Sequence, residues 1–256
     1  MIRFGRHVWA VVAAEVSKLR HDPVELATRA VQPTLWLVVF GSVMAHVREL
    51  STGNLRYLDF ITPGVLAQST LFISIFFGIA AIWERDLGVL QKLLVSPASR
   101  EALVLGKALS AGARGLSQAA VVYLLALVLG IALDFRPLSL LGVLAVIVIG
   151  CALFSSLSLV IACLVKTRER FMGIGQVLTM PLFFASSAIY PLDLMPGWLR
   201  AVSVVNPLTY EVDALRSLMI AGGGGALGVG ADFAVLIATA AVLIGAAARL
   251  YPAMAA

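Results

Sequence analysis

Charged residues are scarce in this sequence. Only 13% of its 256 residues are Asp, Glu, Lys or Arg, and 61% are hydrophobic. Ordinary soluble domains contain about 25% charged and about 45–50% apolar residues. The composition therefore excludes an ordinary soluble domain and predicts a membrane protein.

The sequence also has few of the residues that build disulfides and metal sites. Its two cysteines, Cys151 and Cys163, fall on one predicted helix, about 18 Å apart at 1.5 Å per residue, so they cannot pair with each other. The three histidines, His7, His21 and His46, are scattered and offer no metal-ligand spacing. No Ser/His/Asp arrangement is suggested. We therefore expect no metal and no catalytic residues, and the chain itself is not expected to be an enzyme.

Nucleotide-binding motifs are missing as well. Gly106-Lys107 is followed by Ala108 instead of Ser or Thr, which excludes a Walker-type phosphate loop. The glycine-rich stretch 222–230 is not followed by a strand-helix unit, which excludes a dinucleotide site. No cofactor is expected in this chain.

Ionisable residues are missing from the middles of the second to fifth apolar runs. A carrier driven by protons or sodium ions usually needs such residues at membrane depth, where each costs about 2.5–3.5 kcal/mol on insertion scales. The energy source is therefore expected to lie outside the chain.

Long apolar runs are what the sequence has in abundance. A helix needs about 20 apolar residues to cross a bilayer. Four charge-free runs approach or exceed that length: 61–83, 115–133, 138–165 and 171–192. Two shorter runs, 30–47 and 233–248, complete six predicted transmembrane helices. Because the runs are continuously apolar instead of alternating, the prediction is an all-α membrane protein and not a β-barrel.

Basic residues gather on one side of this predicted topology. Fourteen of the 19 Lys and Arg residues fall on the side of the first residue, and such an asymmetry places loops in the cytoplasm. Both termini are therefore predicted to be cytoplasmic in a multi-pass protein. The abundance of Ala, Val and Leu points to a bacterial source, so the expected location is the bacterial cytoplasmic (inner) membrane. The same asymmetry explains the sequence pI of about 9.6 without a nucleic-acid partner.

The amino-terminal stretch 1–29 is predicted to form an amphipathic elbow helix on the membrane surface. No cleavable signal peptide is convincing, because the apolar stretch 8–14 is short and is stopped by charged residues. A solvated basic tail is the alternative interpretation.

The stretch 84–106 is the longest predicted cytoplasmic connection. Glu84, Arg85 and Asp86 end the second span, and leucines then recur at spacings of three and four, which predicts a short helix with one apolar face. Such a helix, joined to two spans, is suited to receive a push from a partner protein. The alternative is a solvated charged face.

The stretch 191–225 is placed on the outer side. It contains three prolines and a run of glycines, yet it stays apolar. We predict two short helices, 196–205 and 207–220, the second capped by Asn206. Packed on the bundle, they would dip into the outer leaflet as an outer gate. The alternative is a surface loop with interfacial helices.

Three motifs carry a resemblance to a known family. They are "ERDLGVLQKLLVSPASREALVLGKAL" after the second span, "MPLFFASSAIYPLDLMPGWL" at the end of the fifth, and "NPLTYEVDALRSLM" before the last. In this order and spacing the chain resembles the permease subunits of ABC type-2 exporters, especially the daunorubicin-resistance type of drug efflux permease. The resemblance covers about residues 30–221.

The resemblance implies a single transmembrane permease domain over 1–256 that forms half of a transporter. Two permeases, identical or paralogous, would join two separate ATP-binding-cassette subunits that hold ATP and Mg, within membrane lipids. Glu84, Arg85, Asp86 and Gly88 would meet the ATPase at the coupling helix. The residues that would shape the outer gate are Pro191, Pro196, Asn206, Pro207, Tyr210 and Arg216.

The cargo is predicted to be a lipophilic drug or lipid-like molecule exported from the cell. Its path is predicted to use aromatic and polar side chains of the second and fifth spans, although simple helix packing also explains each of them. These residues are Phe72, Phe76, Phe77, Gln176, Thr179, Phe183 and Phe184. Two alternatives stay open: export of a lipid-linked polysaccharide, which the near absence of aromatics from 138–165 disfavours, and a membrane scaffold without transport.

Overall fold

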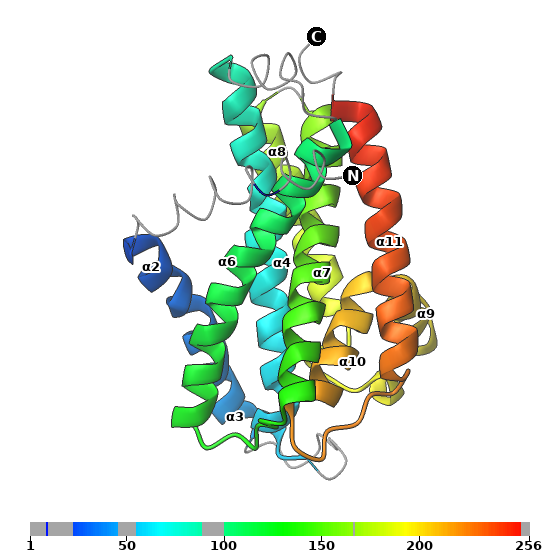
Figure 1. Ribbon diagram of the computed structural model, residues 1–256. Helices are drawn as coiled ribbons and strands as arrows, with labels where there is room; N and C mark the ends of the chain where they lie inside the picture. The colour runs from blue at the N-terminus through cyan, green and yellow to red at the C-terminus, as the bar shows by residue number, and fades with distance from the viewer. Residues whose placement is uncertain (1–8, 10–22, 46–54, 89–99, 166, 252–256) are drawn as a thin grey trace.

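A computed structural model describes residues 9, 23–45, 55–88, 100–165 and 167–251 of the chain (Figure 1). In these ranges the regular structure is helical, and β-structure is limited to a single bridge between Leu133 and Ile220. The long helices run roughly side by side.

The first described helical segment is continuous from Pro23 to Met44, as α2 (Pro23–Thr34), η1 (Leu35–Gly41) and α3 (Ser42–Met44). The middle part is a π-helix. It follows Pro33, whose ring removes one backbone hydrogen bond from the α-helical ladder. The first apolar helix thus begins before residue 30, inside the stretch predicted as the elbow. The rest of that elbow, apart from Trp9, lies outside the described residues.

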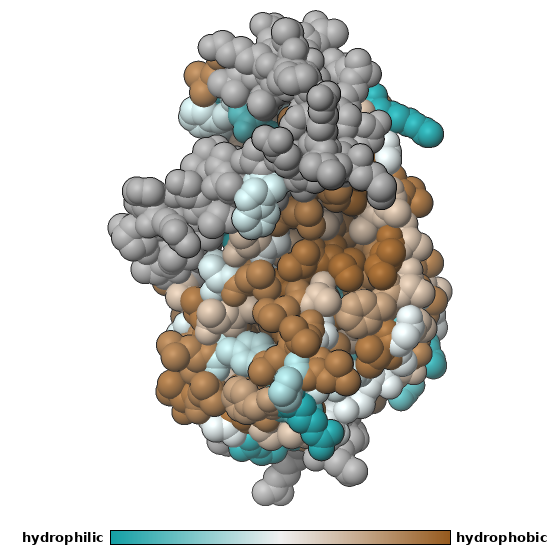
Figure 2. Space-filling view, viewed as in Figure 1, coloured by the Kyte–Doolittle hydropathy of each residue, from teal (hydrophilic) through white to brown (hydrophobic). Residues whose placement is uncertain are grey.

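Four of the described helices are long and apolar enough to cross a membrane: α4 (Tyr57–Asp86), α6 (Arg100–Val128, apolar from Ala102), α7 (Pro137–Leu164) and α11 (Val229–Leu250). Helix α7 lies at the centre and packs against α4, α6 and α11 (Figure 1). Figure 2 shows a broad apolar belt across this face, with hydrophilic residues toward its upper and lower edges. The chain is a multi-pass membrane protein, as its composition predicts.

The third predicted span begins earlier than the sequence indicates. Helix α6 starts at Arg100, fifteen residues before Gly115, where the charge-free run begins. Its first turns are apolar on the side that faces the bundle, where Val104, Ala108 and Ala111 are fully buried. Arg114 therefore lies inside α6, a helix long and apolar enough to cross a membrane, and not in a loop before it.

The fifth predicted span ends earlier than the sequence indicates. Helix α8 covers Arg168–Phe184, so the chain leaves the helix eight residues before Leu192. Pro181 weakens the last turn, and the Ser186 hydroxyl caps it by donating to the Phe183 carbonyl at 2.7 Å. Helix α8 and the apolar segment 30–44 are too short to count among the four clear spans. The full set of six transmembrane helices therefore stays a prediction.

The two short helices predicted after α8 are present. A 3-10 turn, η2 (Leu192–Leu194), is followed by α9 (Gly197–Val205) and α10 (Pro207–Met219). Helix α10 packs against α4, α7 and α11. Its end is tied to the α6–α7 loop, because Ala221 N–H donates to the Ala132 carbonyl and Asp134 N–H donates to the Met219 carbonyl, both at 2.8 Å.

Small residues let these helices approach closely, as is typical of membrane bundles. The Gly78 N–H of α4 donates to the Ser158 hydroxyl of α7 at 2.9 Å. The same hydroxyl donates back to the Ile75 carbonyl of α4. A single serine thus bonds α7 directly to the α4 backbone, and this contact requires the absence of a side chain at Gly78.

Candidate functional site

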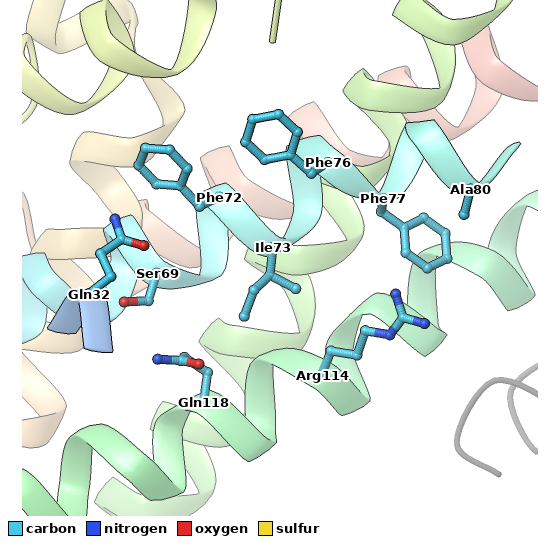
Figure 3. A pocket seen from close by; sticks show the side chains of 9 residues that line it. All are labelled: Gln32, Ser69, Phe72, Ile73, Phe76, Phe77, Ala80, Arg114 and Gln118. Atoms are coloured by element: carbon cyan, nitrogen blue, oxygen red, sulfur yellow. The ribbon is translucent and has the colours of Figure 1, made fainter. Parts of the chain in front are cut away.

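A cavity of about 300 Å³ lies between α2, α4 and α6 (Figure 3). Its aromatic lining is Phe72, Phe76 and Phe77 of α4, the three aromatics that the sequence predicts in the cargo path. The rings of Phe72 and Phe76 stack with centroids 6.2 Å apart, as expected for residues one helical turn apart. The prediction that they share a face is confirmed.

Four polar side chains in this cavity escape the sequence analysis. Ser69 of α4 lies one and two turns before Ile73 and Phe77 on the same face, and Arg114 and Gln118 of α6 are also one turn apart. Figure 3 shows Arg114 and Gln118 reaching from α6 toward α4, with Gln32 of α2 beside Ser69. The spacing of four residues could have found Ser69, Arg114 and Gln118, whereas Gln32 carries no such signal. The cavity thus joins aromatic surface with hydroxyl, amide and guanidinium groups.

The α8 residues predicted in the cargo path do not line this cavity. Thr179 and Phe183 are buried, and the Phe183 ring packs edge-on against Trp36 of η1 with centroids 5.3 Å apart. Gln176 and Phe184 are exposed on the outside of the bundle. The structure therefore does not bring the two sets of predicted cargo-path residues together. The α4 residues line a cavity, whereas the α8 residues are either buried in helix packing or exposed on the surface.

The predicted coupling residues join several helices at one end of the bundle, where α4 ends at Asp86. The Arg168 guanidinium of α8 donates to the Asp86 carboxylate at 2.7 and 3.1 Å and lies 3.8 Å from the centre of the Trp83 ring. Arg85 is paired with the same carboxylate at 3.1 Å. Glu84 is paired with the buried Lys107 of α6.

This ionic network, made of Glu84, Arg85, Asp86, Lys107 and Arg168, links the ends of α4, α6 and α8. The Lys107 ammonium also lies 5.9 Å from the ring centre of Tyr251, directly after α11.

Gly88 turns the chain with φ = 69°, a backbone conformation that side chains disfavour. Residues 89–99, the body of the predicted coupling helix, lie outside the described residues. The sequence indicates the acidic members, whereas their partners Lys107 and Arg168 emerge only from the fold.

At the other end, Asn206 holds two helices together. Its side-chain oxygen accepts a hydrogen bond from Leu208 N–H at 3.0 Å, so the predicted cap of α10 is confirmed. Its amide nitrogen donates to the Leu182 and Ala185 carbonyls at 2.6 and 3.2 Å, at the end of α8. One side chain therefore caps the start of α10 and satisfies carbonyl groups that the end of α8 leaves free.

Arg216 anchors the chain segment between α8 and η2. Its guanidinium donates to the Ser187 carbonyl at 2.6 Å and to the Phe60 carbonyl at 3.4 Å, and it stacks 3.9 Å from the centre of the Phe60 ring. The residue is only 5% exposed.

The other predicted gate residues lie at the ends of the short helices. Pro191 and Pro196 precede η2 and α9, Pro207 is the first residue of α10, and the Tyr210 hydroxyl donates to the Val204 carbonyl at 2.8 Å.

Replacing Asn206 separates its two roles. Asn206→Ala should lower the free energy of unfolding by about 2 kcal/mol, because the α10 cap and two bonds to α8 are lost. Asn206→Asp keeps the capping oxygen but cannot donate to the α8 carbonyls. If the bridge matters, Asp is at least as destabilising as Ala in thermal unfolding of the purified chain. A wild-type midpoint for Asn206→Asp would show that only the cap matters.

The comparisons with known proteins point to one family. Residues 6–220 match the ABC-2 type transporter family. The chain is 32% identical to the ycf38 transport permease of Cyanophora paradoxa over 219 residues, covering 84% of this chain and 74% of that protein. It is 26% identical to the daunorubicin resistance ABC transporter permease protein DrrB1 of Streptomyces coeruleorubidus, over 96% of this chain and 84% of that protein. The inner membrane transport permease YadH of Escherichia coli K12 is 27% identical over 72% of this chain and 70% of its own length.

Proposed function

The chain belongs to the ABC-2 type transporter family, and from this premise we propose that it is the transmembrane subunit of an ATP-driven exporter. The cargo is a lipophilic drug or a lipid-like molecule that leaves the cell. ATP is bound and hydrolysed by two separate ATP-binding subunits, which engage a pair of permeases in a cytoplasmic membrane. The family match over most of the chain, with a drug-resistance permease among the relatives, supports this proposal.

The ionic network is proposed to receive the movement of the ATP-binding subunits. In this arrangement Glu84, Arg85 and Asp86 meet the ATPase at the coupling segment 84–106. Glu84 and Asp86 also connect this segment to α6 and α8, because their carboxylates pair with Lys107 and Arg168, and Arg85 pairs with Asp86. A push on this segment would thus move three helices together.

The cavity between α2, α4 and α6 is proposed as the part of the cargo path within this chain. Its aromatic rings suit the apolar body of a cargo molecule, and its hydroxyl, amide and guanidinium groups suit a polar end. The segment 191–225 is proposed as the outer gate, because its Asn206 and Arg216 bond the end of α8 and the chain segment that follows it.

Transport assays on the reconstituted complex test this function. The permease and its ATP-binding subunit in vesicles should hydrolyse ATP faster when cargo is added. Phe76→Ala should raise the cargo concentration for half-maximal stimulation about tenfold, because an aromatic contact is worth roughly 1.5 kcal/mol. Phe135→Ala, an exposed aromatic that does not line the cavity, is the matched control.

Three results would contradict the proposal. Equal half-maximal concentrations for Phe76→Ala and Phe135→Ala would remove the cavity from the cargo path. Stimulation by lipid-linked sugars and not by lipophilic drugs would favour polysaccharide export. Unchanged efflux and drug tolerance in cells that lack the chain would favour a membrane scaffold.

A further inference from the structure

We propose that Glu211 of α10 is a proton-binding site that controls how α10 packs against α4 and α7. Its carboxyl group holds a proton while the three helices are in contact, and loss of the proton releases α10. The site depends on neither the cargo nor the ATP-binding subunits, so it can be tested on this chain alone.

Glu211 lies in a place that suits only an uncharged group. Its side chain is fully buried. The carboxyl group lies directly on the α7 backbone at Gly150, where an added Cβ would be 2.5 Å from the carboxyl carbon and 2.6 and 2.7 Å from its two oxygens. The absent side chain of Gly150 therefore forms the seat for the Glu211 carboxyl group.

The hydrogen bonds around Thr70 are best satisfied when Glu211 is protonated. The Thr70 hydroxyl oxygen lies 2.9 Å from the Ala67 carbonyl oxygen and also 2.9 Å from Glu211 Oε1. A hydroxyl has one hydrogen to donate, and a carbonyl oxygen can only accept. When Thr70 donates to Ala67, the contact with Glu211 is a hydrogen bond only if the carboxyl group supplies the hydrogen.

No positive charge compensates Glu211 within the described part of the chain. Its second oxygen, Oε2, has no hydrogen-bond partner. The groups that face it are Thr70 of α4 and the Cys151 thiol of α7, next to Gly150, and both are neutral. A carboxylate that is buried without a counter-charge costs far more than a protonated carboxyl, so the neutral form is the one that fits.

The other charged groups nearby are engaged elsewhere. On α10 itself, Arg216 is bound to the Ser187 carbonyl and stacked on Phe60. Asp213 accepts from the N–H groups of Ala226 and Leu227 at 2.8 and 2.9 Å. The Asp232 side chain of α11 is buried without a hydrogen-bond partner in the described structure, and being acidic it offers Glu211 no counter-charge. None of them forms an ion pair with Glu211 in the described structure.

Ionisation of Glu211 would therefore work against the packing of α10. The new charge gains hydration only if α10 moves away from Gly150 and Thr70 and lets water reach the carboxylate. Neutral Glu211 holds the helices together at low pH, and the packing weakens as pH rises through its ionisation. Because Asn206 caps the start of α10 and also bonds the end of α8, the movement would reach the segment proposed as the outer gate.

Cys151 provides a native reporter of this movement. It is fully buried beside the Glu211 seat, and Cys163 on the same helix can be replaced by serine. Maleimide labelling of the purified chain in lipid nanodiscs is measured between about pH 6 and about pH 9, around the range in which buried carboxyls titrate. Glu211→Gln, which is neutral at every pH, corrects for the pH dependence of the thiol itself.

The expected result is a rising ratio of labelling rates. Wild type and Glu211→Gln should label equally at low pH, and the wild-type rate should then exceed the variant rate by up to about tenfold per pH unit above the ionisation midpoint. A constant ratio over the whole range would overturn the proposal. If Glu211→Gln does not fold, the ratio of Cys151 to Cys163 labelling rates in the wild-type chain is measured instead. A ratio that rises with pH supports the proposal, and a constant ratio overturns it.

A second variant tests the seat directly. Gly150→Ala places a methyl group where the carboxyl lies and should expose Cys151 at every pH. Gly245→Ala on α11, whose added Cβ would meet nothing within 4 Å, is the matched control. Labelling of Gly150→Ala at the rate of Gly245→Ala would show that the seat does not hold α10, and would overturn the proposal.

Discussion

Gly64→Ala is expected to remove most of the folded protein from the membrane. An added Cβ on Gly64 of α4 would lie 2.5 Å from the Ala188 carbonyl oxygen, 2.8 Å from its Cα and 2.9 Å from its carbonyl carbon. All three are backbone atoms, so no side-chain rotation relieves the clash. The segment after α8 must therefore move away from α4.

The movement would also break the anchor at Arg216. Its guanidinium donates to Ser187, next to Ala188, and to Phe60, one turn before Gly64. Overpacking costs about 1–3 kcal/mol and the loss of a hydrogen bond to a buried charge costs about 1.5–3 kcal/mol. The total approaches the marginal stability of about 5–15 kcal/mol that a typical folded domain has.

Thermal unfolding of the purified chain in detergent checks this prediction, together with the fraction that elutes as a single species. Gly245→Ala is again the matched control, because it adds the same methyl group where there is open space. Alanine has a better helix propensity than glycine, so the control should be as stable as wild type or slightly more stable. Equal unfolding midpoints for the two variants would contradict the close contact between α4 and Ala188.

The sequence predicts the long helices well and the ends of α6 and α8 poorly. Helices α4, α7 and α11 match apolar runs within a few residues, because continuous hydrophobicity is a local property of the chain. The predicted start of the third span is too late, because the charges of Lys107 and Arg114 suggest that these residues precede the helix. The structure instead keeps both inside the helix, with Lys107 paired to Glu84 of α4. A contact between two distant helices leaves no local signal.

In the candidate site, too, the sequence predicts local features and misses contacts between distant residues. The spacing of Phe72 and Phe76 is readable from the sequence, and so is the Asn206-Pro207 start of α10. Asn206 also donates to the end of α8, and its acceptors there, Leu182 and Ala185, lie 24 and 21 positions earlier in the chain. The local sequence around Asn206 therefore does not predict this second role. The sequence analysis does not single out Glu211, and only the fold shows that it is buried.

Reversing the charge of Asp86 or Arg168 is expected to uncouple ATP hydrolysis from cargo with little loss of stability. Both side chains are about one-third exposed, and ion pairs of this kind contribute about 0–1 kcal/mol to folding. Their proposed role is mechanical, since they join the last turn of α4 to the first turn of α8 beside the coupling segment. Asp86→Arg or Arg168→Asp alone should therefore reduce cargo-stimulated ATP hydrolysis roughly tenfold, in line with coupling free energies of about 1–3 kcal/mol.

The double variant Asp86→Arg/Arg168→Asp restores opposite charges across the same gap and should recover a large part of the stimulation. Arg170→Asp is the matched control: Arg170 lies on the same turn of α8, is exposed and forms no ion pair with another described residue. ATP hydrolysis with and without cargo in reconstituted vesicles measures the coupling, and unfolding midpoints confirm that every variant is folded. A double variant no better than either single one would rule out the pair as the link, because a transmitted push needs the attraction between these two helices and not a particular residue on either.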